Sequence, residues 1–474
     1  MIDKKTKIVA TLGPASSTYE TIKTMIAHGL DVCRINFSHG DHATHQRTID
    51  NIRKAREELG SHTAILADLQ GPKLRIGDVE DGKILLVEDH EIRFTTHESV
   101  GNLEKLYITY PQFPKDVRAG ERILLDDGKI ILETVSTNGK DEVVAKVVHG
   151  GILTGQKGVN LPNTKISLPS LTEKDMKDLE FALDQDVDWI GLSFVRSADD
   201  IVRLRNIIDA KGKHARIIAK IEKPEAIEDI SEIIKETDGI MVARGDLGVE
   251  IPLENVPLIQ KMLIKKSLKN SKPVIVATQM MESMISDYTP TRAEVNDVAN
   301  AVLDGADAVM LSAETSVGKF PVRVIDVMSK IVREVESSEL IYHHEEPPAE
   351  SVEDRFITDS VCYNATRLSK RTKARAIVTM TFSGYTGFKI ASQRPQAQIF
   401  VFTGNQNLLN QMNLVWGVRS FFYDKMVSTD HTIADIRHIL KKKGYLQQGD
   451  FIIHLASIPI SERGMTNMLK LGQV

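Results

Sequence analysis

Charged and hydroxyl side chains stand at the ends of three successive apolar runs within residues 216–278. Lys220 and Glu222 end the first run, Asp246 follows the second, and Thr278 follows the third. Runs that are apolar throughout are typical of strands buried on both faces, as in a parallel sheet. Lys220 and Glu222 are two residues apart on such a strand and therefore point to the same side. We expect all four side chains to meet at the carboxyl-end face of a β/α barrel, where several strands contribute catalytic residues.

These residue types suit the transfer of a phosphoryl group. Carboxylates such as Glu222 and Asp246 suit a hard cation such as Mg²⁺, which takes one or two carboxylates together with substrate oxygens and water. Lys220 adds a compact positive charge for the phosphoryl group in transfer. Gly245 allows close approach of the backbone, and a short helix beginning at Leu247 would offer its amide groups to an anion. A single Lys–Glu pair would more often be an ordinary ion pair, so the prediction rests on the shared register of all these groups.

Composition limits the class of protein. The chain has 474 residues, which suits three domains or one barrel with two smaller modules. Sixty Lys and Arg face 65 Asp and Glu, and this mild net charge of −5 favours neither nucleic acid nor an anionic membrane as a partner. Cys33 and Cys362 form no disulfide framework, and we find neither a signal-peptide core nor a run of about 18 apolar residues. We therefore expect a soluble, cytoplasmic protein.

Alternating strand and helix patterns predict a closed (β/α)₈ barrel in preference to an open sheet. The eight expected strands are residues 6–13, 30–37, 64–69, 189–195, 216–222, 239–245, 273–279 and 308–315. After the third strand the alternation stops, and short runs separated by Asp127-Gly128 and Asn138-Gly139 turns predict an inserted β-rich domain. We expect this insertion to form a small β-barrel that can close over the barrel mouth as a lid.

A third unit is predicted after an acidic stretch that contains Pro347-Pro348. Strands separated by helices in this last part indicate an open α/β domain. The expected boundaries are 1–71 and 167–345 for the two parts of the barrel, 72–166 for the insertion and 346–474 for the C-terminal domain.

Seven long motifs are similar to those of the pyruvate kinase family. They are KIVATLGPAS (7–16), RINFSHG (34–40), KGVNLP (157–162), KIE (220–222), MVARGDLGVEIP (241–252), ATQMMESMI (277–285) and PTRAEVNDVANAVLDGADAVMLSAET (290–315). The C-terminal domain resembles the family more loosely, through Thr466-Asn467 and a Ser383-Gly384 loop. The resemblance implies that phosphoenolpyruvate and ADP give pyruvate and ATP with Mg²⁺ or Mn²⁺. It also implies a homotetramer with a regulatory C-terminal domain.

The resemblance assigns roles to the residues at the strand ends. Arg34 would bind the transferring phosphate, and Lys220 would stabilise it between donor and acceptor. Glu222 and Asp246 would ligate Mg²⁺, and the backbone amides of residues 245 and 246 would hold the substrate carboxylate. Thr278 would take part in protonation of the enolate. This set of cations, carboxylates and backbone amides suits phosphoryl transfer, which depends on the positioning of the reactants and on neutralisation of their charge.

The resemblance also implies a nucleotide site and a monovalent-cation site. Asn36, His39 and Arg75 would face the nucleotide, whereas Asn36, Ser38 and Asp68 lie where the family ligates a monovalent cation. Taken alone, His39 would more often be a turn histidine and Arg75 a solvated charge.

Two regions of the chain depart from the family pattern near the expected active site. Potassium-dependent members carry Thr-Lys after the aspartate that matches Asp68 and a Glu at position 73, whereas this chain has Leu69-Gln70 and Lys73. A lysine ammonium is itself a unit cation, so we predict activity without K⁺; the alternative is a Lys73 that points to solvent. Ser197 replaces a residue that is usually basic on the nucleotide side, which leaves the nucleoside diphosphate preference open.

One loop of the C-terminal domain resembles the family's sugar-phosphate loop, through Thr381, Ser383, Gly384 and Thr386. Its hydroxyl and N–H groups suit phosphate. However, Phe382 and Tyr385 stand where regulated members often have basic residues, which argues against fructose 1,6-bisphosphate. A sugar monophosphate or AMP as effector, or no effector, remain the alternatives.

Two other classes of function compete with this interpretation. One is a lyase that uses Mg²⁺ to act on pyruvate or phosphoenolpyruvate, which needs neither an inserted lid nor a lysine beside the metal. The other is a non-catalytic member of the family, against which the intact set of Arg34, Lys220, Glu222, Asp246 and Thr278 argues.

Overall fold

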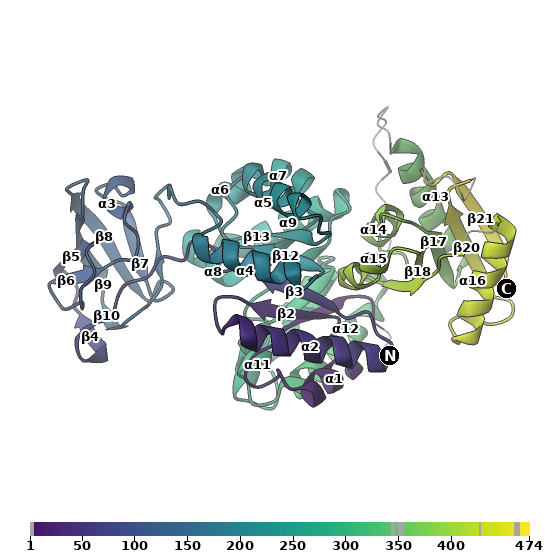
Figure 1. The fold of residues 1–474 in the computed structure, drawn as a ribbon, viewed down its shortest axis with the longest axis horizontal. Helices are drawn as coiled ribbons and strands as arrows, with labels where there is room; N and C mark the ends of the chain where they lie inside the picture. Colours follow the sequence, from purple (N-terminus) through teal and green to yellow (C-terminus); the bar gives the residue numbers. More distant parts are fainter. Residues whose placement is uncertain (1–3, 343–346, 349–354, 426–427, 459–464) are drawn as a thin grey trace.

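The computed structural model describes residues 4–342, 347–348, 355–425, 428–458 and 465–474. Its centre is a closed barrel of eight parallel strands, in the order β1-β16-β15-β14-β13-β12-β3-β2 (Figure 1). The strands are β1 (Lys7–Thr11), β2 (Val32–Asn36), β3 (Ala64–Asp68), β12 (Trp189–Leu192), β13 (Arg216–Ile221), β14 (Gly239–Ala243), β15 (Val274–Ala277) and β16 (Ala308–Leu311). All eight strands expected from the sequence are confirmed.

Every residue of β1, β3, β12, β14, β15 and β16 is buried, because helices cover the outside of the barrel and side chains fill its inside. The helices of this layer are α1 (Tyr19–Ala27), α2 (His42–Leu59), α4 (Glu173–Asp184), α5 (Ala198–Ala210), α6 (Pro224–Glu228), α7 (Ile230–Glu236), α8 (Arg244–Glu250), α9 (Val256–Lys269), α10 (Arg292–Leu303), α11 (Ala313–Ser316) and α12 (Pro321–Glu336). The N-terminus of α4 has a capping box between Thr172 and Asp175.

Strand register aligns the carboxyl ends that carry the site. Asn36 on β2 pairs with Asp68 on β3, and Gly191 on β12 pairs with Asp68 from the other side. Lys220 on β13 pairs with Met241 on β14. The polar residues that follow these strands therefore reach one rim of the barrel.

The insertion after β3 has its own hydrophobic core. It contains β4 (Lys83–Leu86), β5 (Glu91–Thr95), β6 (Lys105–Tyr107), α3 (Phe113–Asp116), β7 (Arg122–Leu125), β8 (Ile130–Thr137), β9 (Glu142–His149), β10 (Gly151–Thr154) and β11 (Val159–Asn160). Its strands form a six-stranded sheet, β11-β7-β8-β9-β5-β6, and a separate β10-β4 ribbon. The segment 74–77 joins the two edges of the sheet, because the Ile76 N–H donates to the Lys157 carbonyl beside β11 and the Gly77 N–H donates to the Tyr107 carbonyl of β6. The sheet is closed through this segment, as expected for a small β-barrel.

The C-terminal part is an open sheet of five strands in the order β19-β18-β17-β20-β21, as expected for an α/β domain. Its elements are α13 (Phe356–Thr372), β17 (Ala376–Met380), α14 (Tyr385–Ser392), β18 (Gln398–Thr403), α15 (Gln406–Gln411), β19 (Val418–Phe422), α16 (Thr429–Lys442), β20 (Phe451–Ala456) and β21 (Met468–Gln473). β21 runs antiparallel to β20 and was not expected. Of the acidic stretch around Pro347-Pro348, residues 343–346 and 349–354 lie outside the described residues.

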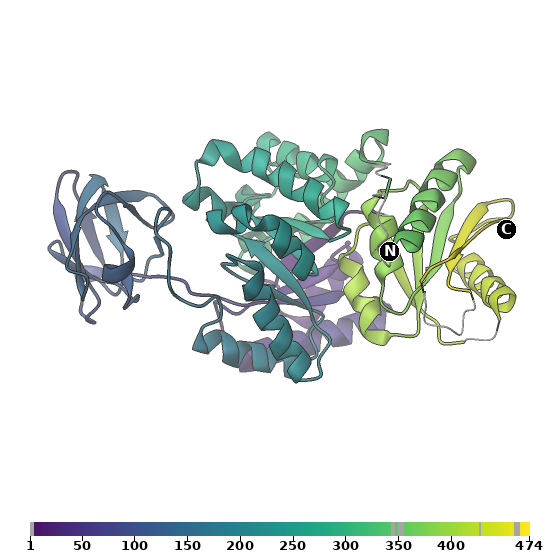
Figure 2. The ribbon, with the colours of Figure 1, turned by 90° about the horizontal axis from the view of Figure 1, so that it is seen from above.

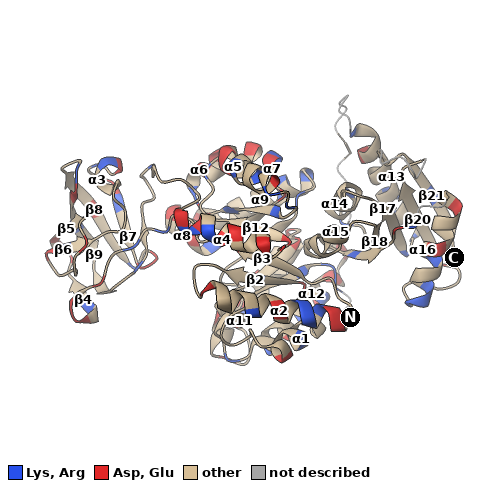
Figure 3. Ribbon diagram, viewed as in Figure 1, with Lys and Arg blue, Asp and Glu red and all other residues tan. Residues whose placement is uncertain are grey.

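The insertion and the C-terminal unit lie at opposite ends of the elongated molecule (Figures 1 and 2). The insertion follows the carboxyl end of β3, whereas the C-terminal unit contacts the segment before β1, where the Gly417 N–H donates to the Lys5 carbonyl at 2.8 Å. Acidic and basic residues are interspersed over the barrel helices (Figure 3). Among the described residues, no helix has the length and apolar character needed to cross a membrane.

A buried ion pair joins the C-terminal unit to the barrel. Arg394 and Asp307 are 1% and 3% exposed, and the Arg394 Nη2 donates to Asp307 Oδ2 at 2.9 Å. The guanidinium also lies 4.9 Å from the ring centroid of Trp416. Because both charges are buried, removing either residue would leave the charge of the other buried without a partner.

We predict that Arg394→Met lowers the free energy of unfolding by about 3–5 kcal/mol, because it leaves the Asp307 carboxylate buried without its cation. Urea unfolding followed by tryptophan fluorescence measures this. Lys235→Met, which removes an exposed pair with Glu232, is the control and should change little. Equal effects of the two substitutions would contradict the structural importance of the buried pair.

Candidate active site

Asp68 lies at the centre of the site, between two cations from other strands. The Arg34 Nε donates to Asp68 Oδ2 at 2.6 Å, and the Lys220 Nζ lies 3.2 Å from Asp68 Oδ1. Asp68 is 1% exposed and ends β3, whereas Arg34 is on β2 and Lys220 on β13. One carboxylate thus holds two positive charges next to each other at the carboxyl-end rim.

Glu222 and Ser193 complete the surroundings of the lysine. The Lys220 Nζ lies 2.9 Å from Glu222 Oε1 and donates to Ser193 Oγ at 2.7 Å. The Phe194 N–H donates to Glu222 Oε2 at 2.8 Å. Ser193 was not predicted as a site residue, although it follows the apolar run of β12 just as the predicted residues follow theirs.

Burial and neighbouring charges set the protonation of this cluster. Burial alone would lower the pKa of Lys220, but Asp68 and Glu222 outweigh it, so the pKa is raised and the ammonium stays charged. Burial alone would raise the pKa of Asp68, but Lys220 and Arg34 reverse this and lower it. The pKa of Glu222 is raised, first by burial and then by the nearby Asp246 carboxylate, against the attraction of Lys220.

Asp246 lies in the first turn of α8, which corrects the expected start of this helix at Leu247. The helix begins at Arg244, so the amides of Gly245 and Asp246 belong to its first turn and have no partner within the helix. The Gly245 N–H donates to the Thr278 Oγ1 at 2.7 Å. In this state the Gly245 amide is therefore occupied by the threonine hydroxyl.

Thr278 has a strained backbone, with φ at +68°. A β-branched residue in the left-handed region costs energy and persists only where its surroundings hold it, often at a functional site. Arg244 provides this support, because its Nη2 donates to the Thr278 carbonyl at 2.6 Å while its Nη1 donates to Asp297 at 2.7 Å. The sequence pattern marked Thr278 but gave no sign of the strain or of the supporting Arg244.

The residues expected at the nucleotide lie on the same rim, where the His39 N–H donates to the Asn36 carbonyl at 3.3 Å. Asn36 is half-buried, and its Oδ1 accepts the Ser38 N–H at 3.1 Å. His39 is exposed, and its pKa is lowered by partial burial and then by the charges of Arg75 and Lys73. The Arg75 Nη1 donates to the carbonyl of residue 156 in the insertion at 2.9 Å.

Lys73 is exposed at the entry to the insertion. Within the described part of the chain, no carboxylate oxygen lies within 4.0 Å of its ammonium, and its Cε is 3.8 Å from the position of a Cβ on Gly158. Its charge nevertheless reaches His39. Ser197 is the N-cap residue of α5, and its N–H lies 3.4 Å from Asp200 Oδ2.

Most polar groups of the candidate effector loop form hydrogen bonds within the protein. The Gly384 N–H donates to Thr381 Oγ1 at 3.0 Å, and the hydroxyls of Thr386 and Thr466 lie 2.8 Å apart. Thr386 is only 4% exposed. The Ser383 carbonyl accepts a hydrogen bond from Arg216 of β13 at 2.9 Å. Of the four predicted effector residues, Ser383 has the most accessible side chain.

Two protein-family models match the chain, one over the barrel with its insertion and the other over the C-terminal unit. Residues 3–325 match the model described as pyruvate kinase, barrel domain, and residues 359–471 match that described as pyruvate kinase, alpha/beta domain.

Curated relatives match almost the whole chain. A pyruvate kinase of Corynebacterium glutamicum is 44% identical over 468 residues, covering 99% of this chain and 97% of the relative. A pyruvate kinase of Mycobacterium tuberculosis is 41% identical over 471 residues, covering 99% and 98%. Among solved structures, a pyruvate kinase from Cryptosporidium parvum superposes with a TM-score of 0.92 at 34% identity, covering 99% of this chain and 96% of that one.

We predict that Asp68→Asn lowers the free energy of unfolding by about 3–5 kcal/mol at pH 7, because Arg34 and Lys220 then lose the carboxylate that they share and only Lys220 keeps an anion, Glu222, beside it. The pKa of Asp68 is lowered by folding, so its contribution is full above about pH 4 and is lost as the pH falls through the folded-state pKa. Urea unfolding of both proteins at pH 7, 5 and 3 measures this difference.

The control for this prediction is Asp89→Asn, which removes the carboxylate of an exposed pair with Lys146 and should have little effect. If the stability difference between the Asp68 variant and the native chain were constant from pH 7 to pH 3, Asp68 would not be the charged partner of these cations.

Proposed function

The chain belongs to the pyruvate kinase family, and on this premise we propose that it transfers the phosphoryl group of phosphoenolpyruvate to ADP, giving pyruvate and ATP. The proposal is carried by one observation beyond the family match. Two cations, Arg34 and Lys220, are held side by side by Asp68 on a rim that also bears the carboxylates of Glu222 and Asp246. Adjacent cations and acids are what a phosphoryl group and its metal ion require.

Lys220 and Arg34 are prepared for an anion before it arrives. The raised pKa keeps the Lys220 ammonium charged, so its charge is available throughout the transfer. Arg34 uses its Nε for Asp68 and its Nη1 for the Thr11 hydroxyl at 2.7 Å. The remaining guanidinium N–H groups suit two phosphate oxygens. Both groups are fixed by strand ends, so they need little reorganisation in the transition state.

Glu222 and Asp246 fit a divalent metal ion. Each Glu222 oxygen already accepts one contact but has lone pairs left, and Asp246 is half-buried and close enough to raise the Glu222 pKa. The described residues contain no group of three or more His, Cys, Asp or Glu side chains suited to a metal. Two carboxylates suit Mg²⁺ or Mn²⁺ that takes its other ligands from substrate and water. Such an ion would neutralise charge that develops on substrate oxygens.

We assign the substrate carboxylate to the amides of Gly245 and Asp246, and enolate protonation to the surroundings of Thr278. The Thr278 hydroxyl donates to the Ala277 carbonyl at 2.6 Å and accepts from Gly245, so it is held in one orientation. Substrate that takes the Gly245 amide would release this hydroxyl for the enolate. Asn36, His39 and Arg75 are assigned to the nucleotide by resemblance.

A lyase acting on the same substrates is the second candidate function. It would share the metal carboxylates but would form no ATP. A coupled assay that measures ATP from ADP and phosphoenolpyruvate distinguishes the two. Formation of pyruvate without ATP would support the lyase.

We predict that Lys220→Met lowers kcat by about 10³-fold, because the charge that stabilises the phosphoryl group is lost. The ATP assay measures this at saturating substrates. Lys272→Met is the control, since Lys272 is a half-buried lysine that donates to the carbonyl of Thr237 at the opposite end of the barrel. Full activity of the Lys220 variant would instead indicate a family member that no longer uses this site for catalysis.

We further propose that turnover needs no K⁺. Lys73 stands at the position of the Glu of potassium-dependent members, and its charge reaches the rim, as its effect on His39 indicates. Asn36, Ser38 and Asp68 are retained, but the Asp68 charge is already balanced by Arg34 and Lys220. These observations support a site in which protein cations replace the monovalent ion.

We predict full activity of the native chain in potassium-free tetramethylammonium buffer, and loss of most turnover by Lys73→Glu in that buffer with recovery on adding K⁺. The charge reversal removes the fixed cation and creates a ligand for the free one. Lys83→Glu, at an exposed site in the insertion, is the control for charge reversal. A native enzyme that is inactive until K⁺ is added rules the proposal out.

The remaining assignments rest on the family resemblance. We propose a homotetramer in the cytoplasm, with units that divide near residues 71, 166 and 345. The loop of Thr381, Ser383, Gly384 and Thr386 is assigned to an effector by resemblance alone, and most of its polar groups bond within the chain.

A further inference from the structure

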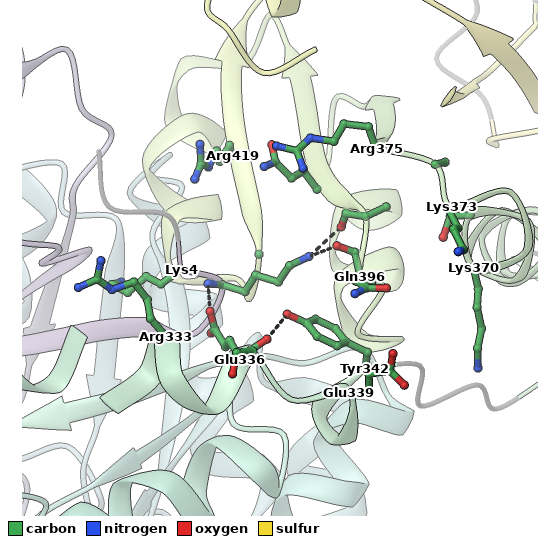
Figure 4. Close-up of a pocket in the computed structure, with 17 residues that line it drawn as sticks. Lys4, Arg333, Glu336, Glu339, Tyr342, Lys370, Lys373, Arg375, Gln396 and Arg419 are labelled. Carbon is green, nitrogen blue, oxygen red and sulfur yellow. Dashed lines mark hydrogen bonds between the residues drawn. The ribbon is translucent and has the colours of Figure 1, made fainter. Parts of the chain in front are cut away.

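A cleft of about 870 Å³ lies between the barrel and the C-terminal unit (Figure 4). Lys5 spans it, with its ammonium donating to the carbonyls of Pro395, Gln396 and Ala397 at 2.8–2.9 Å. The ammonium also lies 4.9 Å from the ring centroid of Trp416. The volume is within the usual range for sites that hold small molecules. The cleft is at the end of the barrel opposite the candidate active site and has no part in the proposed reaction.

The described residues that line this cleft are strongly basic. The barrel side contributes Lys4, Lys5 and Arg333. The C-terminal side contributes Lys370, Lys373, Arg375 and Arg419. The acidic lining residues are Glu336 and Glu339. This excess of positive charge is opposite in sign to the net charge of −5 of the whole chain.

Glu336 offers little compensation for this charge. Its two oxygens accept the backbone N–H groups of Lys5 at 2.8 Å and Thr6 at 2.6 Å. It is 9% exposed, and burial raises its pKa. Its carboxylate thus serves to anchor the segment that leads into β1.

Three of the cations have no acidic partner in the described part of the chain. No carboxylate oxygen lies within 4.0 Å of the charged groups of Arg333, Lys373 or Arg375. Arg333 stands on the barrel side, and the other two on the C-terminal side (Figure 4). All three are exposed. Unpaired like charges on facing walls are relieved by an anion between them.

We propose that this cleft binds a phosphorylated small molecule that carries at least two negative charges. Lysine and arginine are the usual ligands of phosphate oxygens, and a multiply charged anion can contact both walls at once. The loop at Thr381–Thr386 is a less suitable site, since its hydroxyl and amide groups already bond within the chain. A bound anion would join the barrel to the C-terminal unit and so stabilise their arrangement.

Binding to the full-length protein is tested by isothermal titration calorimetry in EDTA without divalent metal. Inorganic pyrophosphate probes a compact anion, and fructose 1,6-bisphosphate probes two separated phosphates. The test variant is Lys373→Gln/Arg375→Gln. The matched control is Arg371→Gln/Lys442→Gln, which removes two exposed charges of the same unit outside the cleft. A third variant, Thr381→Ala/Ser383→Ala, reports on the loop.

We expect saturable binding of at least one probe, weakened at least about tenfold by the cleft variant and unchanged in the control and loop variants. The same probe should raise the midpoint of thermal unfolding in the native chain but not in the cleft variant. Three results would overturn the proposal: no saturable binding of either probe, equal weakening in the cleft and control variants, or loss of binding in the loop variant alone. The ATP assay of the native chain tests the proposed function independently, so the two can fail separately.

Discussion

The electrostatic sharing of Asp68 between Arg34 and Lys220 is the constraint on which the site depends. These two buried cations stand on β2 and β13, which are separated by β3 and β12 in the barrel. They repel each other, and an anion of fixed position between them keeps them together. Asp68 is fixed because it ends β3 between β2 and β12 of a closed barrel. The order of the strands in the barrel thus places two positive charges next to each other, and it is to these charges that we assign the substrate phosphate.

The same rim also contains Thr278, whose strained backbone is held by Arg244. Thr278 is held in the left-handed region by Arg244, and its hydroxyl occupies the Gly245 amide at the start of α8. The helix amide, the hydroxyl and the carboxylate of Asp246 therefore form one unit, which faces the cluster around Lys220. The charged cluster around Lys220 and the unit that contains Thr278 come from different strands of the barrel. Because the barrel is closed, the two groups keep a fixed position relative to each other.

The sequence predicted the eight barrel strands because each is an apolar run that ends in polar residues. The same-side placement of Lys220 and Glu222 followed from strand periodicity. Asp68 was expected only as a cation ligand, since its role as a shared counter-ion depends on contacts between strands that are distant in the sequence. The φ of Thr278 and its support by Arg244 leave no local pattern. The strands β6, β10, β11, β19 and β21 were missed. The first three have too few residues to show an alternating pattern, and the last two are the edge strands of the C-terminal sheet.

Anomalous diffraction from crystals grown with Mn²⁺ and phosphoenolpyruvate would show directly whether the metal and the phosphate meet at this rim. We expect a manganese peak about 2.1 Å from oxygens of both Glu222 and Asp246, with the substrate phosphate contacting Lys220 and Arg34 while both still hold Asp68. A manganese ion bound elsewhere, or a phosphate that contacts neither cation, would show that Asp68 does not hold these cations for the substrate.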